Sequence, residues 1–136
     1  MTDALHVDVV AADRRVWEGE ALSIVARTSE GDVGILPGHE PFLAVLVPCM
    51  VEILTDGGTR EIIVVDGGFL SVADNRVAVL SPYGRLAKEI SLADAESELR
   101  AAEKRLEAGE IDLETRQHHQ RATAQLRAAQ RAHQNH

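Results

Sequence analysis

The sequence predicts an α+β fold, in which an N-terminal antiparallel β-sandwich over residues 1–86 precedes a C-terminal antiparallel two-helix hairpin over residues 87–136. The first observation is a change in hydrophobic period. Apolar residues form short or alternating runs in the first part and recur at steps of three and four in the second. The second observation is the distribution of turn formers, because of 10 glycines and 4 prolines only Gly109 lies after residue 85. Many short strands separated by such turns are typical of a sandwich or barrel.

The predicted strands lie between turn signals. A hairpin is indicated by Asp56-Gly57-Gly58, which separates two apolar runs. We expect Asp66-Gly67-Gly68 to turn the chain into a further strand, and residues 73–76 to turn it into the last one. The six predicted strands are residues 5–10, 21–26, 51–54, 61–65, 69–72 and 77–80.

The two predicted helices have recognisable ends. Ser91 is a suitable N-cap for the first helix, and Gly109 is expected to end it. Asp112 is expected to cap the second helix, and the short link before it forces the two helices antiparallel. The predicted apolar stripes are Leu92, Ala95, Leu99, Ala102 and Leu106 in the first helix, and Thr115, His119, Ala122, Leu126, Ala129 and His133 in the second. Because alanine makes up about half of each stripe, the hairpin should be only marginally stable on its own.

Charge divides this hairpin into two parts. Residues 89–115 hold nine acids and three bases, whereas residues 116–136 hold four arginines and no acid. One interpretation is that the basic helix pairs with the acidic helix inside the hairpin. The other is that the basic helix leaves its partner and meets an acidic surface elsewhere.

The bulk composition limits the classes of function. With 136 residues, the chain can form one small domain with an appendage. A formal net charge of -8 argues against a nucleic-acid partner and against direct adhesion to anionic lipid. The single cysteine, Cys49, excludes an internal disulfide. No signal peptide is predicted. No membrane span is predicted either, because Pro48 interrupts the longest apolar run, and we therefore expect membrane contact only through partners.

Motifs that carry chemistry are missing from the sequence. There is no phosphate-binding Gly-x4-Gly-Lys-Ser/Thr loop, no Gly-x-Ser-x-Gly nucleophile elbow and no second cysteine for a metal site. His118 and His119 are adjacent and therefore point to different faces of a helix, which disfavours a joint metal site. We expect no catalytic residue, no metal and no cofactor.

The segment Ser29-Glu-Gly-Asp-Val-Gly-Ile-Leu-Pro-Gly-His-Glu-Pro-Phe-Leu43 resembles the signature of the epsilon subunits of bacterial F-type ATP synthases. The match is long and ungapped, and further matches keep register at residues 5–10, 66–72, 77–80 and 124–127. The resemblance covers the whole chain and agrees with the two-part organisation. The signature itself, with three glycines and two prolines, predicts a stiff, preformed surface loop suited to docking.

The resemblance implies a non-catalytic rotor subunit on the cytoplasmic face of the bacterial plasma membrane. In that family the sandwich joins the gamma subunit and the c-subunit ring, and the hairpin can extend into the alpha/beta catalytic head and block ATP hydrolysis. It implies that Ser29, Glu30, Gly31, Asp32 and His39 dock to the c-ring and gamma. It also implies that Arg121, Arg127 and Arg131 contact the catalytic head; Arg127 and Arg131 share a helix face and are expected to matter most.

One segment departs from the family pattern. Many members bind ATP through Ile/Leu-Asp-x-x-Arg-Ala, and the matching residues here are Ile90, Ser91, Asp94 and Ala95. Ser91 replaces the acid and Asp94 replaces the arginine, which reverses charge where a phosphate would lie, so weak or absent ATP binding is expected. Two alternatives stay open at this point: a nucleotide-sensing module with the same fold, and an unrelated adaptor with a β-sandwich head and a helical-hairpin tail.

Overall fold

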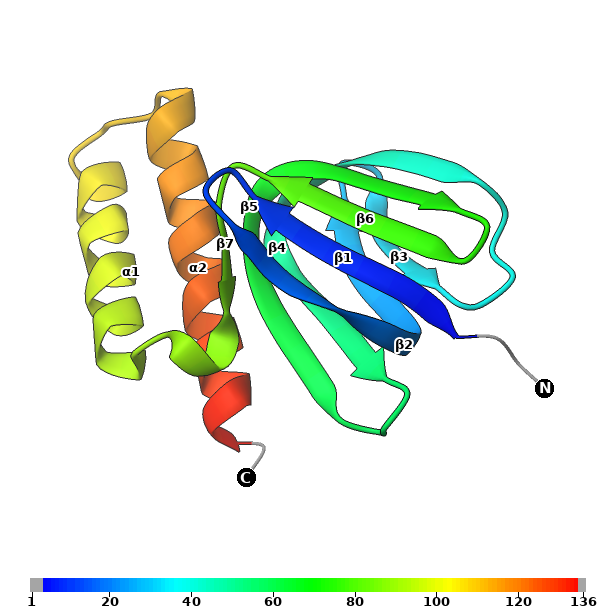
Figure 1. The fold of residues 1–136 in the computed structure, drawn as a ribbon. Helices are drawn as coiled ribbons and strands as arrows, with labels where there is room; N and C mark the ends of the chain where they lie inside the picture. Colours follow the sequence, from blue (N-terminus) through cyan, green and yellow to red (C-terminus); the bar gives the residue numbers. More distant parts are fainter. Residues whose placement is uncertain (1–3, 135–136) are drawn as a thin grey trace.

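The computed structural model describes residues 4–134 and shows a β-domain with a two-helix hairpin against one side (Figure 1). The strands, in chain order, are β1 (Leu5–Ala11), β2 (Arg15–Thr28), β3 (Gly31–Ile35), β4 (Phe42–Thr55), β5 (Arg60–Ala73), β6 (Arg76–Ser81) and β7 (Gly84–Leu86). A 3₁₀ turn, Ala87–Glu89, leads to α1 (Leu92–Glu107) and α2 (Leu113–Gln134). The predicted fold class is confirmed. The outermost parts of the two predicted domains, residues 1–3 and 135–136, lie outside the described residues.

Five strands form a closed ring in the order β1, β6, β5, β4, β2, because β1 pairs with both β6 and β2. β3 lies beside β2, and the short β7 pairs with β5. Within residues 4–134 the one parallel pair is β1–β6, with Val7 beside Val77, and the other pairs are antiparallel. Alternate side chains point inward and form an aliphatic core, whose large fully buried members include Leu5, Ile24, Ile53, Ile63 and Leu70.

β5 runs without interruption from Arg60 to Ala73, so the turn predicted at Asp66-Gly67-Gly68 is wrong. Gly68 has a φ of 108°, and a Cβ added to it would lie 1.9 Å from the backbone oxygen of Leu80 in β6. The glycines therefore let two strands approach closely, a role that sequence reasoning cannot separate from a turn signal.

The glycine–proline segment contains a strand that the sequence analysis did not predict. Residues 31–35 form β3, which pairs antiparallel with β2 and places Ile35 opposite Ile24 in the core. The expectation of a surface loop throughout this segment is therefore wrong for its first half, and the loop is confined to residues 36–41. A strand forms here because the apolar residues Val33 and Ile35 alternate with exposed residues. Two glycines in the same segment made this alternation difficult to recognise as a strand pattern in the sequence.

The helix ends agree with the prediction. The Ser91 hydroxyl accepts a hydrogen bond of 3.3 Å from the backbone N–H of Asp94. Gly109, at a φ of 88°, follows the end of α1. At the start of α2, the Asp112 carboxylate accepts a 2.7 Å hydrogen bond from the backbone N–H of Thr115. Hydrogen bonding from the Thr115 side chain, and then from this backbone N–H, lowers the pKa of Asp112.

α2 lies between α1 and the β-domain, so it is covered on two sides (Figure 1). The predicted stripe accounts for the burial of Thr115, Ala122 and Ala129. Ala124 and Ala128 are buried as well, in a second cluster that includes Ile62 and Val64 of β5. The expectation of a single narrow stripe on this helix is therefore incomplete. Within residues 4–134, no helix is both long and apolar enough to cross a membrane.

Candidate functional site

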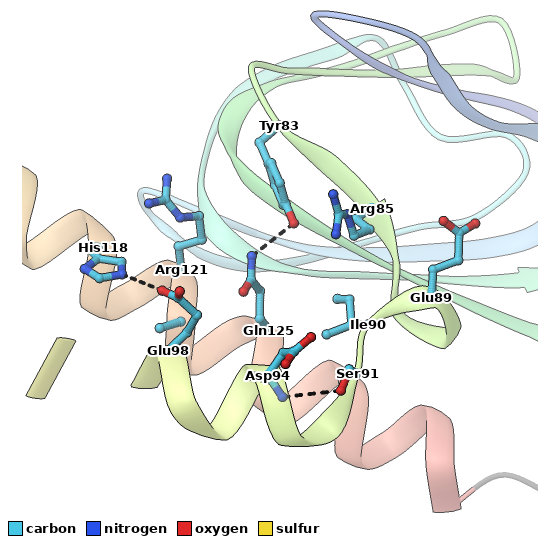
Figure 2. Close-up of a pocket in the computed structure, with 12 residues that line it drawn as sticks. Tyr83, Arg85, Glu89, Ile90, Ser91, Asp94, Glu98, His118, Arg121 and Gln125 are labelled. Atoms are coloured by element: carbon cyan, nitrogen blue, oxygen red, sulfur yellow. Dashed lines mark hydrogen bonds and ion pairs between the residues drawn. The ribbon is translucent and has the colours of Figure 1, made fainter. Parts of the chain in front are cut away.

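The contact between α2 and the β-domain combines small apolar side chains with charge pairs. An Arg121 guanidinium N–H donates a 2.8 Å hydrogen bond to the carboxylate of Asp66 in β5. Arg131, almost three turns further along α2, forms an ion pair with Glu52 of β4. Between these two contacts, the Gln125 amide donates a 3.1 Å hydrogen bond to the Tyr83 hydroxyl (Figure 2). Sequence reasoning missed these partners, because residues 55 positions apart carry no local signal of contact.

The other two arginines of α2 are placed differently. Arg127 is exposed and forms no ion pair with any residue of the described range, and the same holds for Arg116. In this conformation Arg121 and Arg131 hold the helix to the β-domain, and the expected importance of Arg127 and Arg131 at the catalytic head stays a prediction. Helix geometry places Arg127 and Arg131 one turn apart, but among the described residues only Arg131 has an acidic partner on the β-domain.

Between α1 and α2 the polar contacts use Glu98 and Arg105 of α1 with His118 and Thr115 of α2. His118 Nε2 lies 3.0 Å from a Glu98 carboxylate oxygen, and an Arg105 N–H of α1 donates a 3.0 Å hydrogen bond to the Thr115 hydroxyl (Figure 2 shows the first). Within residues 4–134, no arginine of α2 pairs with an acid of α1. The interpretation that the basic helix is simply the charge partner of the acidic helix is wrong for this conformation.

The predicted docking residues fall into two places at opposite ends of β3. Ser29 and Glu30 form the turn between β2 and β3, and Gly31 and Asp32 begin β3. Asp32 is held by Arg27 at 2.8 Å, and this hydrogen bond, together with the charge of Arg27, lowers the pKa of Asp32. This end presents an exposed, hydrogen-bonded turn.

His39 lies beyond the other end of β3, in the loop at residues 36–41. Its ring packs edge-on against Phe42 with centroids 5.7 Å apart. The neighbouring Gly38 N–H donates a 2.7 Å hydrogen bond to the Asn75 side chain at the β5–β6 turn. His39 therefore belongs with the start of β4 and the β5–β6 turn rather than with the turn at Ser29.

An exposed apolar row crosses three neighbouring strands, β4, β5 and β6. Val45, Phe69 and Leu80 lie opposite one another on β4, β5 and β6, and each is about half exposed. Leu43, two residues before Val45, is 73% exposed. Solvent-facing positions of a sandwich are ordinarily polar, so a continuous row of this kind marks an interaction surface. The signal was present in residues 42–47, which are apolar at successive positions, but the strand there was not predicted.

The residues of the degenerate ATP motif line a cavity of about 330 Å³ between α1, α2 and the segment after β7 (Figure 2). Ile90, Ser91, Asp94 and Ala95 all contribute to its wall, so the structure brings this predicted set together. The charged groups around it are the carboxylates Glu89, Asp94 and Glu98 and the guanidinium groups Arg85 and Arg121. Arg121 already binds Asp66, and Arg85 lies over the Tyr83 ring. This donor set does not fit a triphosphate, because acids outnumber free cations.

Comparison with known proteins gives the same family as the signature. Residues 4–82 match the family described as ATP synthase, Delta/Epsilon chain, beta-sandwich domain. A Streptomyces coelicolor protein named "ATP synthase epsilon chain" is 43% identical over 129 residues, covering 95% of this chain and 98% of the relative. One of the same name from Cutibacterium acnes is 47% identical over 103 residues, covering 75% and 70%.

The fold also matches a solved structure of this kind. A chain of the Euglena gracilis mitochondrial ATP synthase, solved as "OSCP/F1/c-ring in rotational state 1", superposes with a TM-score of 0.76 at 24% identity and covers 97% of this chain and 82% of its own. At that identity the likeness supports the fold alone, and the family rests on the bacterial relatives and the matched β-domain. This chain belongs to the ATP synthase delta/epsilon family, among its bacterial epsilon chains, and it is a non-catalytic subunit rather than an enzyme.

Proposed function

We propose that this chain is a central-stalk rotor subunit of a proton-translocating F-type ATP synthase, peripheral on the cytoplasmic face of the plasma membrane. In this proposal residues 1–86 couple the c-subunit ring to the catalytic head through gamma, and residues 87–136 regulate ATP hydrolysis. The near full-length relationship to epsilon chains carries the assignment to the complex. The rotor position and the regulatory role are proposals that go beyond this assignment to the complex.

Two surfaces are available for the two rotor partners. The apolar row of Leu43, Val45, Phe69 and Leu80 suits a stable hydrophobic contact, and we assign it to gamma. We assign His39, in the loop at residues 36–41, to gamma as well. The turn at Ser29 and Glu30, with Gly31 and Asp32, is polar and stiff, and we assign it to the c-ring. The two surfaces adjoin at the β2–β3 turn, where the Ser29 backbone N–H donates a 3.0 Å hydrogen bond to the Val45 carbonyl, so we expect gamma and the c-ring to meet there.

The observation that supports the regulatory role is how α2 is held. An alanine-rich contact, two ion pairs and one amide–hydroxyl hydrogen bond join it to the β-domain. Partly exposed pairs contribute about 0.2–1 kcal/mol each, so the docked hairpin and an extended hairpin differ little in free energy. In the extended state, the freed arginines would meet acidic loops of the alpha/beta head and inhibit hydrolysis.

The test is to assemble the ATP synthase complex with a chain truncated after residue 110. We expect assembly to be intact, because the β-domain keeps its own core, and ATP hydrolysis to be faster than in the complex with the full chain. Hydrolysis at the same rate in both complexes would remove the inhibitory role from α2. Failure of the truncated chain to co-purify with gamma would contradict the assignment of docking to residues 1–86.

A further inference from the structure

A groove of about 490 Å³ runs along the other side of α2, where the helix faces β2 and β4. Its floor is apolar and comes from the β-domain: Val25 is 41% exposed there, and Val47, Pro48 and Met50 are half-buried. Its wall is the polar face of α2, which includes Gln120 and Arg127. Small-molecule sites in proteins have volumes of about 300–1,000 Å³ and this same combination of an apolar lining with a few polar groups.

The charges around the groove do not balance. Its two carboxylates are both occupied, since Asp32 is paired with Arg27 and Glu52 with Arg131. Two guanidinium groups, Arg27 and Arg127, line the groove, and Arg131 neutralises Glu52 from outside the lining, so the surplus positive charge lies on Arg127, which has no ion-pair partner among residues 4–134. A planar guanidinium beside an apolar floor suits one anionic group attached to an apolar body.

We propose that this groove binds a small amphiphilic anion, with an aliphatic body over Val25, Val47 and Met50 and a carboxylate held by Arg127. The groove takes its floor from the β-domain and its wall from α2, so it exists only while the hairpin is docked. A ligand of this kind therefore stabilises the docked state by mass action. It also covers Arg127, which the proposed function assigns to the catalytic head in the extended state. This regulatory consequence rests on the proposed function, whereas binding to the isolated chain does not.

Binding is tested on the full chain with decanoate as the probe, kept below its micelle-forming concentration and followed by calorimetry and by NMR shifts. We expect a Kd of about 1 mM, the affinity usual for a ligand of this size. Arg127→Gln should weaken binding about tenfold, because one charge-assisted contact is lost. Arg116→Gln is the matched control: Arg116 is also exposed and unpaired within the described residues, but it does not line the groove, and its substitution should leave binding unchanged.

Two further probes separate this site from general adsorption. Decyltrimethylammonium has the same body with the opposite charge, and acetate has the charge without the body; both should bind much more weakly than decanoate. Val47→Asp, with its fold checked by circular dichroism, should also abolish decanoate binding by placing an acid in the floor. Equal binding of the two decyl probes, or an unchanged Kd in Arg127→Gln, overturns the proposal.

The assembled complex separates failure of the site from failure of the proposed function. If decanoate binds as expected, it should raise ATP hydrolysis by the complex with the full chain and have no effect on the complex truncated after residue 110. Binding without this response leaves the site in place and contradicts the inhibitory role of α2. Hydrogen exchange of Val47 and Met50 should be compared between the ligand-free complex and the free chain. If both residues are more protected in the complex, another subunit fills the groove and the small-ligand assignment is overturned.

Discussion

Arg121 in α2 and Asp66 in β5 form a 2.8 Å ion pair across 55 residues of chain. The Asp66 side chain is 19% exposed and the Arg121 side chain 36%, so the pair is only partly screened by solvent. Asp66 also belongs to the Asp-Gly-Gly segment in which Gly68 approaches the Leu80 carbonyl of β6 closely. One acidic residue thus joins this close approach to the helix that moves in the proposed switch.

Asp66→Asn should weaken docking of α2 by about 1 kcal/mol, because the carboxylate is lost while the shape of the side chain is kept. Faster hydrogen exchange of α2 amides in the isolated chain measures this. In the complex, hydrolysis should fall, since Asp66 acts only in the docked state and its loss favours extension. Glu103→Gln, on the exposed face of α1, serves as the control and should change neither quantity.

Arg127 and Arg131 should respond differently to charge reversal, although helix geometry places them one turn apart. Arg127→Glu breaks no ion pair within the described residues, so it affects only the extended state. Because it weakens that inhibitory state, ATP hydrolysis should rise. Arg131→Glu also breaks the contact with Glu52, which favours extension, so its rise should be smaller. Both effects should fade at high salt. Equal rises would show that the Glu52 contact contributes nothing to docking.

Gly68→Ala should destabilise the β-domain by about 2–4 kcal/mol, because the added Cβ meets the Leu80 carbonyl at 1.9 Å and the backbone has a positive φ. Thermal unfolding measures the loss. Gly34→Ala is a matched strand control, since a Cβ there has nothing within 4 Å and its φ is ordinary. If the two variants melt at the same temperature, the close approach of β5 and β6 is not required.

The isolated chain should bind ATP weakly or not at all, because Asp94 and two further carboxylates line the cavity and Arg121 is already paired with Asp66. Calorimetry would show a micromolar Kd if this is wrong. Introducing Asp94→Arg together with Ser91→Asp should restore some affinity by replacing repulsion with a guanidinium. Aspartate is also a good N-cap, so the second change keeps the start of α1.

Stability of the β-domain should decrease as pH rises through the titration of His6. The carboxylates of Glu20 and then Glu18 accept hydrogen bonds of 3.0 Å from the His6 ring, and these contacts raise the pKa of His6 above its ordinary value of 6.5. The contribution of the charged imidazole is therefore complete below pH 6.5 and is lost as pH rises through the raised pKa of the folded state. An NMR titration of His6 tests the direction of the shift. His6→Gln should flatten the pH dependence of the melting temperature in this range.

Local chemistry made much of the fold predictable. The hairpin turn at Asp56–Gly58, the Ser91 and Asp112 caps and the change of period near residue 85 each depend on neighbouring residues, and each is confirmed. The strand at residues 42–47 and the short β7 were not predicted, and two further differences, the unpredicted β3 and the false break in β5, have one cause. Glycine relaxes the backbone in a turn and beside a close strand alike, so β3 and the uninterrupted β5 could not be distinguished from loops by composition.

Residue types and their spacing along the chain therefore specify the elements, their caps and the family. The candidate sites depend on contacts between distant segments, and these arise only when the ring of strands closes and α2 packs against it. Closure sets Val45, Phe69 and Leu80 in one row, although they come from three strands. Docking of α2 gives Arg121 and Arg131 their acidic partners and leaves Arg127 facing the groove. In the sequence these three arginines are alike; their environments differ because the folded β-domain places Asp66 beside Arg121 and Glu52 beside Arg131, and places no free acid beside Arg127.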